Sequence, residues 1–162
     1  MNIQELFLRQ KQAEHEGTLA VYWKIPPDRL DWRPGEGMLT LGQLARHAWK
    51  SEEGNRRIAL DDDWTYYETR VPLGLFAILG EVKSLDEELQ ELKRVHQDTR
   101  RAAEAFPLER WDEIRENARF KTRRTVGEIL FRILEHQVHH RAQAGTYLRI
   151  LTGNPASPYP VP

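Results

Sequence analysis

The sequence predicts an all-α protein that folds as a four-helix bundle with long connections between some of its helices. Three observations support this prediction. Four long segments repeat apolar residues at intervals of three and four, the spacing that places side chains on one face of an α-helix. Three of these segments begin with a capping box, and prolines or glycines lie between the segments. No stretch shows the alternation of apolar and polar residues that predicts a β-strand.

Composition limits the class of protein. A chain of 162 residues is long enough for one domain with a sizeable core, so residues 1–162 are expected to form a single domain. No segment has the roughly 20 apolar residues of a membrane span. The N-terminus lacks the pattern of a signal peptide, so a cytoplasmic location is expected. The net charge of −1 argues against nucleic acid as a partner, because phosphate binding requires a basic surface.

The first helix is expected over residues 2–24. The prolines of Lys24-Ile25-Pro26-Pro27 end it, since proline cannot continue a helix. A loop over residues 26–39 follows. The residues expected to face the core are Ile3, Leu6, Phe7 and Val21.

The second helix begins after Thr40, which forms a capping box with Gln43, and runs to about Ala59. Residues 60–83 contain an acidic run and several aromatic residues. They are expected to form a long connection with a short helix near residues 73–82.

The third helix begins with a capping box of Ser84 and Glu87 and ends at Pro107. Its inward face carries apolar or small residues and one histidine: Leu85, Leu89, Leu92, His96, Thr99, Ala103 and Phe106. A polar connection without strands is expected after it.

The last helix begins with a capping box of Thr125 and Glu128 and ends at Gly153. The proline-rich tail over residues 155–162 is expected to be extended. One face of the helix carries Val126, Ile129, Ile133, His136, His140, Ala144, Tyr147 and Leu151.

Two histidines on the last helix predict a metal site. His136 and His140 are four residues apart, so both imidazoles can point at one metal ion. A core histidine that only hydrogen-bonds to its neighbours is the alternative for each. Two on one apolar stripe, a turn apart, favour metal binding.

The residues alone leave two candidates for the third ligand. His47, at the edge of the second helix's inner face, is one candidate, and three protein ligands with an open position are typical of a catalytic site. His96 competes with it, although we interpret it as a buried polar residue or a base that lines a pocket. His139 points to one side and is interpreted as a surface or supporting residue, and His15 as a surface residue.

The chain has no cysteine, so metal ligands must be His, Asp or Glu, and any reactive thiol must arrive as a substrate. Arg141 is a candidate substrate anchor or a partner across an interface, with a solvated helix face as the alternative, and Arg46 is a second candidate anchor. Gln143 is a weaker candidate. Three tryptophans could line a pocket mouth, although tryptophan in a bundle is more often core: Trp32, Trp49 and Trp64.

Several segments together resemble the DinB-like superfamily of metal-dependent helical bundles related to DinB and YfiT. The early ones read Leu30-Asp31-Trp32-Arg33-Pro34 and Leu39-Thr40-Leu41-Gly42-Gln43-Leu44-Ala45-Arg46-His47. The late ones read Thr125-Val126-Gly127-Glu128-Ile129-Leu130 and His136-Gln137-Val138-His139-His140-Arg141-Ala142-Gln143. Their order and spacing are more specific than any one of them.

The resemblance implies an up-down-down-up four-helix bundle that forms a homodimer and binds a divalent metal, most often zinc or nickel. It implies His47, His136 and His140 as the ligands. The family usually has glycine between the arginine and the glutamine, and this chain has Ala142, whose methyl could narrow the approach of a helix or substrate. Characterised relatives resemble S-transferases and isomerases that use low-molecular-weight thiols.

Three hypotheses about function follow. The first is a metal-dependent S-transferase that uses a low-molecular-weight thiol as a cosubstrate. The second is a metal-dependent hydrolase at the same site, for which Glu135 and His139 are the only acid–base candidates adjacent to the ligands in sequence. The third is a non-enzymatic helical dimer in which the histidines or the metal have a structural or sensing role.

Overall fold

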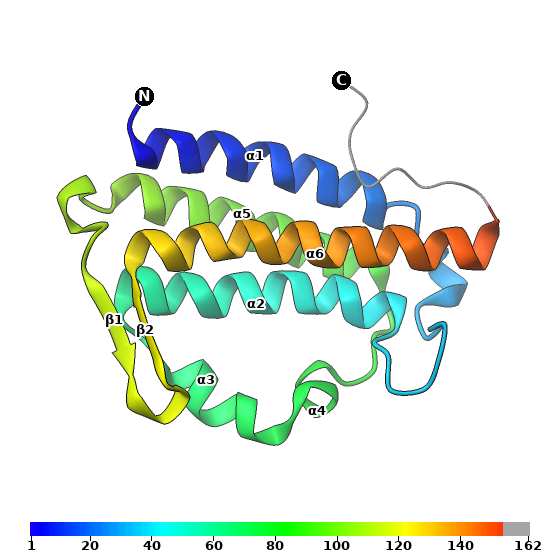
Figure 1. Cartoon of the computed structure of the whole chain (residues 1–162). Helices are drawn as coiled ribbons and strands as arrows, with labels where there is room; N and C mark the ends of the chain where they lie inside the picture. Colours follow the sequence, from blue (N-terminus) through cyan, green and yellow to red (C-terminus); the bar gives the residue numbers. More distant parts are fainter. Residues whose placement is uncertain (154–162) are drawn as a thin grey trace.

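The computed structural model describes residues 1–153, and these residues are predominantly helical, as predicted. Four long helices lie side by side: α1 (Ile3–Tyr22), α2 (Leu41–Asp61), α5 (Leu85–Ala105) and α6 (Val126–Thr152) (Figure 1). In Figure 1, α1 and α6 run from left to right, whereas α2 and α5 run from right to left. The proline-rich tail predicted over residues 155–162 lies outside the described part of the chain.

Capping residues explain where the helices begin. The Thr40 hydroxyl accepts a hydrogen bond from the Gln43 backbone at 3.1 Å, and the Gln43 side chain accepts one from the Thr40 backbone at 3.1 Å. Thr125 and Glu128 make the same reciprocal pair at the start of α6. Ser84 caps α5 through its side chain. Because each cap uses residues three positions apart, these helix starts could be predicted locally.

The first helix also has a capping box, formed by Asn2 and Glu5, which was not predicted. Phe7 and Val21 are buried, as predicted. The prediction that Ile3 faces the core is wrong, because its side chain is 50% exposed. Ile3 lies in the first turn of α1 and lines a surface groove next to Trp111.

Between α2 and α5 the chain forms short helices. These are α3 (Thr65–Arg70), the 3-10 turn η2 (Val71–Leu73) and α4 (Leu75–Leu79). The predicted short helix near residues 73–82 corresponds to α4. A further 3-10 turn, η1 (Pro27–Arg29), lies in the loop after α1.

The connection between α5 and α6 contains a β-hairpin, so the prediction of a polar connection without strands is wrong. After the 3-10 turn η3 (Leu108–Arg110), β1 (Ile114–Asn117) pairs antiparallel with β2 (Thr122–Thr125). The 3-10 turn η4 (Ala118–Phe120) joins the two strands. The strands are four residues each, and all but one of these residues are polar or charged, so they lack the apolar alternation that identifies a half-buried strand.

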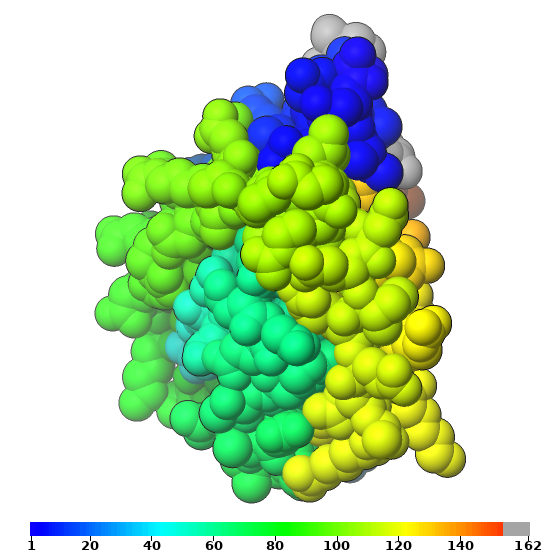
Figure 2. All heavy atoms as spheres, turned by 90° about the vertical axis from the view of Figure 1, so that its left-hand side faces the viewer, coloured from blue at the N-terminus to red at the C-terminus, as the bar shows by residue number. Residues whose placement is uncertain are grey.

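The hairpin packs against the segment that follows α2. Figure 2 shows the hairpin, in yellow-green and yellow, next to this green segment. The Asn117 side chain donates to a Glu68 carboxylate oxygen of α3 at 2.9 Å, and the Trp64 ring stacks on the Phe120 ring with centroids 6.4 Å apart. The hairpin therefore forms one wall of the region between α2 and α6.

The core has an apolar cluster near each end of the long helices and a polar layer between them. One cluster contains Leu44, Leu89 and Leu148, and the other contains Phe7 and Leu130. The polar layer is contributed by all four long helices and contains Lys11, His15, Glu52, His96, Gln137, His140 and Arg141, each at most 8% exposed. Buried polar groups are stable only when they are paired, so this layer is where a function is expected. Within residues 1–153, no helix combines the length and the apolar composition needed to cross a membrane.

Candidate metal centre

Three histidines from two facing helices converge at one point of the polar layer. His47 lies on α2, and His136 and His140 lie one turn apart on α6. One nitrogen atom from each lies within 4.8 Å of the others. The centroid of the His47 ring is 4.7 Å from that of the His136 ring and 4.6 Å from that of the His140 ring. The structure thus brings together the three residues that the family resemblance implied, and they form a group that can hold a metal ion.

The orientation of His140 is set by a residue on its own helix. Its Nδ1 lies 2.9 Å from Oε1 of Gln143, and because an amide oxygen only accepts hydrogen bonds, Nδ1 carries the proton. The Nε2 lone pair then faces His136, whose Nε2 is 3.1 Å away. The Gln143 amide nitrogen donates to the Tyr147 hydroxyl at 3.0 Å, which holds the amide in place. A hydrogen-bonded partner of this kind is what fixes the tautomer of a metal-binding histidine.

The surroundings keep the three imidazoles neutral. Burial lowers the pKa of His136 to about 3 and the pKa of His47 to about 4, with a smaller contribution from His140 to each. Burial also lowers the pKa of His140. Neutral imidazole is the form that binds a metal, and two imidazole Nε2 atoms 3.1 Å apart gain from a cation between them. The donor set therefore fits a divalent metal.

The two arginines considered as substrate anchors hold helices together. Arg141 is 2% exposed, and its Nη2 lies 2.7 Å from a carboxylate oxygen of Glu14 on α1. Arg46 donates from Nε to Glu88 of α5 at 3.0 Å and from Nη1 to the Leu79 carbonyl at 2.8 Å. The alternative of a solvated helix face is therefore wrong for Arg141, whose side chain joins α6 to α1.

His96 and His15 lie away from the three-histidine group, in the layer between α1 and α5. The His96 ring stacks on the His15 ring with centroids 3.7 Å apart, and its Nδ1 is 3.1 Å from Nζ of Lys11. The interpretation of His15 as a surface residue is wrong, because the side chain is 5% exposed. Lys11 and His15 follow Phe7 at intervals of four, so all three lie on the buried face of α1.

The remaining predicted residues have separate places. His139 is exposed, and its ring centroid lies 4.7 Å from that of His140. Trp32 packs on Tyr147, and Trp64 lines a pocket. Ala142 is exposed, so its methyl group does not meet another helix of this chain.

Sequence reasoning missed two polar residues of α2. The Ser51 hydroxyl is 3.4 Å from Nε2 of His136. Glu52 is 1% exposed, accepts a hydrogen bond from the Gln137 side chain at 2.6 Å and pairs with Lys11. The signal that could have identified Glu52 is its place one turn after the buried Ala48 on the inner face of α2.

Comparison with known proteins concerns the family and the fold of the chain. A model of the DinB superfamily matches residues 12–144. The solved structure of YjoA, a DinB-like protein from Bacillus subtilis, is similar to this chain with a TM-score of 0.73 and 18% sequence identity, covering 95% of this chain and 96% of that one. At that identity the likeness concerns the fold. No protein of curated function matches the chain.

Proposed function

This chain belongs to the DinB superfamily, and on that premise we propose that it is an up-down-down-up four-helix bundle whose three-histidine centre holds a catalytic zinc or nickel ion. The ligands are His47, His136 and His140. We propose further that the protein is a thiol-dependent S-transferase that uses a low-molecular-weight thiol as its cosubstrate.

The observation that carries the proposal is the convergence of three neutral imidazoles within 4.8 Å, with one of them oriented by Gln143. Three neutral ligands leave a bound divalent ion its full charge and an open coordination position. The three-histidine group contains no carboxylate, and the chain contains no cysteine. This group therefore supplies no anionic ligand.

A bound divalent ion would supply electrostatic stabilisation that lowers the pKa of a thiol at the open position. The transferase reaction then replaces the leaving group of an electrophile by the sulfur of the thiol: the carbon–sulfur bond forms, the bond to the leaving group breaks, and the thiol proton goes to solvent. The absence of cysteine is consistent with a thiol supplied as a substrate.

Metal content tests the centre. Elemental analysis of the untagged wild type after incubation with Zn²⁺ or Ni²⁺ should give about one ion per chain. The variants His47→Ala, His136→Ala and His140→Ala should each lose it, and His139→Ala should retain it as the matched exposed control. Stoichiometric metal in any of the three ligand variants would remove that residue from the centre.

Activity tests the reaction class. The metal-loaded protein is mixed with an activated aryl chloride and one of several small thiols, and release of chloride is followed. Thiol-dependent turnover that is absent from His136→Ala supports the transferase. Turnover of an ester in the absence of thiol would instead support the hydrolase, for which Glu135 and His139, both in a groove between α1 and α6, are the candidate bases. Metal without turnover would support a structural or sensing role.

Exposed apolar side chains support a homodimer. Val71, Leu73, Leu75 and Phe76, in η2 and α4, are each at least 40% exposed. Clustered exposed apolar residues favour an interface. We expect light scattering to give the mass of a dimer, and Leu73→Asp with Phe76→Asp to shift it to a monomer. Ile150→Asp, at an exposed apolar residue of α6, is the control.

A further inference from the structure

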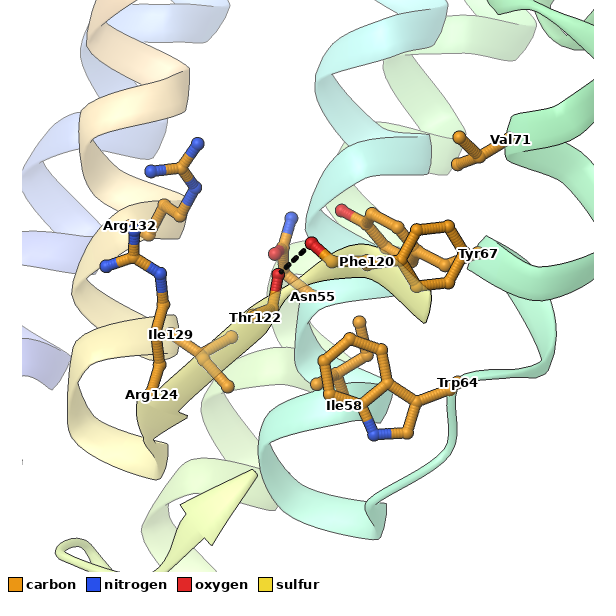
Figure 3. A pocket seen from close by; sticks show the side chains of 10 residues that line it. All are labelled: Asn55, Ile58, Trp64, Tyr67, Val71, Phe120, Thr122, Arg124, Ile129 and Arg132. Carbon is orange, nitrogen blue, oxygen red and sulfur yellow. Dashed lines mark hydrogen bonds between the residues drawn. The ribbon is translucent and has the colours of Figure 1, made fainter. Parts of the chain in front are cut away.

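A pocket of about 280 Å³ lies between α2, α3, the hairpin and α6. Its volume is just below the range of about 300–1,000 Å³ for pockets that bind small molecules. Figure 3 shows its side chains, which come from segments far apart in the sequence. The lining residues used below are Asn55, Trp64, Tyr67, Phe120, Arg124 and Arg132.

One wall of the pocket is aromatic. The Trp64 and Phe120 rings are nearly parallel, at 15°, and the Tyr67 ring meets Phe120 edge-on with centroids 6.1 Å apart. Ile58 and Ile129 add apolar surface. A wall of this kind favours a planar, apolar group on the ligand.

The opposite wall is cationic. Figure 3 shows the Arg124 and Arg132 side chains next to each other, across the pocket from the aromatic rings. Within residues 1–153, neither arginine makes an ion pair with a carboxylate. Two adjacent guanidinium groups repel one another, and an anion between them relieves the repulsion and accepts paired hydrogen bonds. The pocket therefore combines a flat apolar surface with two exposed cationic side chains, a pairing that suits an aromatic ligand with a carboxylate.

The pocket lies next to the three-histidine centre along α2 and α6. Arg132 lies one helical turn before His136 on α6, about 6 Å along the helix axis. On α2, the Asn55 amide of the pocket wall donates to the Ser51 hydroxyl at 3.3 Å, and this hydroxyl is 3.4 Å from Nε2 of His136. A ligand held by the arginines thus lies one turn from the proposed metal.

We propose that this pocket binds the electrophilic substrate of the three-histidine centre, and that this substrate is a small aromatic carboxylate. The ring lies against Trp64 and Phe120, and the carboxylate lies between Arg124 and Arg132. The role of this ligand as a substrate rests on the proposed function. Binding of the ligand to the pocket does not require the metal.

The experiment uses 2-naphthoate as the probe and 2-naphthalenemethanol as its uncharged analogue, with binding to the full chain measured by calorimetry. The carboxylate should bind at least about tenfold more tightly than the alcohol, because charge-assisted hydrogen bonds to the arginines are lost in the alcohol. Arg124→Gln and Arg132→Gln should each reduce this preference. Arg123→Gln is the matched control, since Arg123 lies next to Arg124 on β2 but pairs with Glu116 at 3.6 Å.

A second measurement separates this inference from the proposed function. Titrations are done on the metal-loaded wild type and on His136→Ala, and Co²⁺ is used to broaden the proton signals of a ligand bound nearby. Preference for the carboxylate in both proteins, with broadening only in the Co²⁺-loaded wild type, is expected. Equal binding of acid and alcohol, or a preference that survives both arginine substitutions, would overturn the pocket assignment even if the metal centre is present. Preference for the carboxylate without broadening would show that the ligand does not lie at the centre, and would overturn its role as substrate.

Discussion

Nζ of Lys11 lies 3.0 Å from a carboxylate oxygen of Glu52, and both side chains are at most 1% exposed. The pair joins α1 to α2 in the polar layer. Gln137 of α6 and His96 of α5 hydrogen-bond to it, so all four long helices meet there. Burial lowers the pKa of Lys11, while the charge of Glu52 opposes that shift.

The first prediction concerns this pair. Lys11→Met should reduce the free energy of unfolding by about 3–5 kcal/mol, because it leaves the Glu52 carboxylate buried without its cation. Urea unfolding measures the loss. The double variant Lys11→Met with Glu52→Leu should recover much of it, and the exposed Lys24→Met should have little effect. A double variant as unstable as Lys11→Met alone would mean that lost packing, not the unpaired charge, causes the effect.

The second prediction is a pH dependence. Burial, with a smaller contribution from Lys11, lowers the pKa of His15 to about 3 and that of His96 to about 2. The unfolded chain therefore binds protons that the folded chain does not, below the ordinary histidine pKa of about 6.5. The contribution of each neutral histidine to the free energy of unfolding is complete above that pH and decreases as the pH falls. The decrease is about 2 kcal/mol per histidine from about pH 6.5 to about pH 5.

Urea titrations of the metal-free protein at several pH values test this dependence. The variant His15→Gln with His96→Gln should have a shallower pH dependence than the wild type. His139→Gln, at an exposed histidine, should keep the wild-type slope. Parallel slopes for all three proteins would contradict the assignment.

The third prediction concerns Gln143. Gln143→Leu removes the acceptor for Nδ1 of His140 and should weaken Zn²⁺ binding by about 10–100-fold. Competition with a chelating dye measures the affinity. Gln143→Glu keeps an oxygen acceptor and should bind Zn²⁺ nearly as tightly as the wild type. Weakened binding in both variants would show that the hydrogen bond to Nδ1 is not the reason for the effect.

The fourth prediction concerns a close approach between α2 and the loops that flank it. A Cβ atom at Gly42 would lie 2.8 Å from Cβ of Val82 and 3.0 Å from the Leu30 carbonyl oxygen. Gly42→Ala should therefore destabilise the fold by about 1–3 kcal/mol, although alanine is the better helix former. Gly35→Ala is the control, because its Cβ would meet only Met38, at 3.6 Å. Thermal unfolding distinguishes the two, and equal melting temperatures would refute the steric argument.

The long helices could be predicted from residues that are close in the sequence. The capping boxes at Thr40 and Thr125 act over three residues, and apolar spacing of three and four identifies the buried faces. The hairpin could not be predicted in the same way. Its polar and charged strands are stabilised by pairing with each other and by contact with α3. Neither contact produces a periodic pattern of apolar residues in the sequence.

The sequence by itself determined the long helices and the pairing of His136 with His140, because a helix places residues four apart on one face whatever surrounds it. Only the tertiary structure brought His47 to them from α2, paired Lys11 with Glu52, and placed Arg124 beside Arg132. Each of these depends on how separate helices and the hairpin pack. Packing is decided by the fit of whole surfaces, and no short segment contains that information.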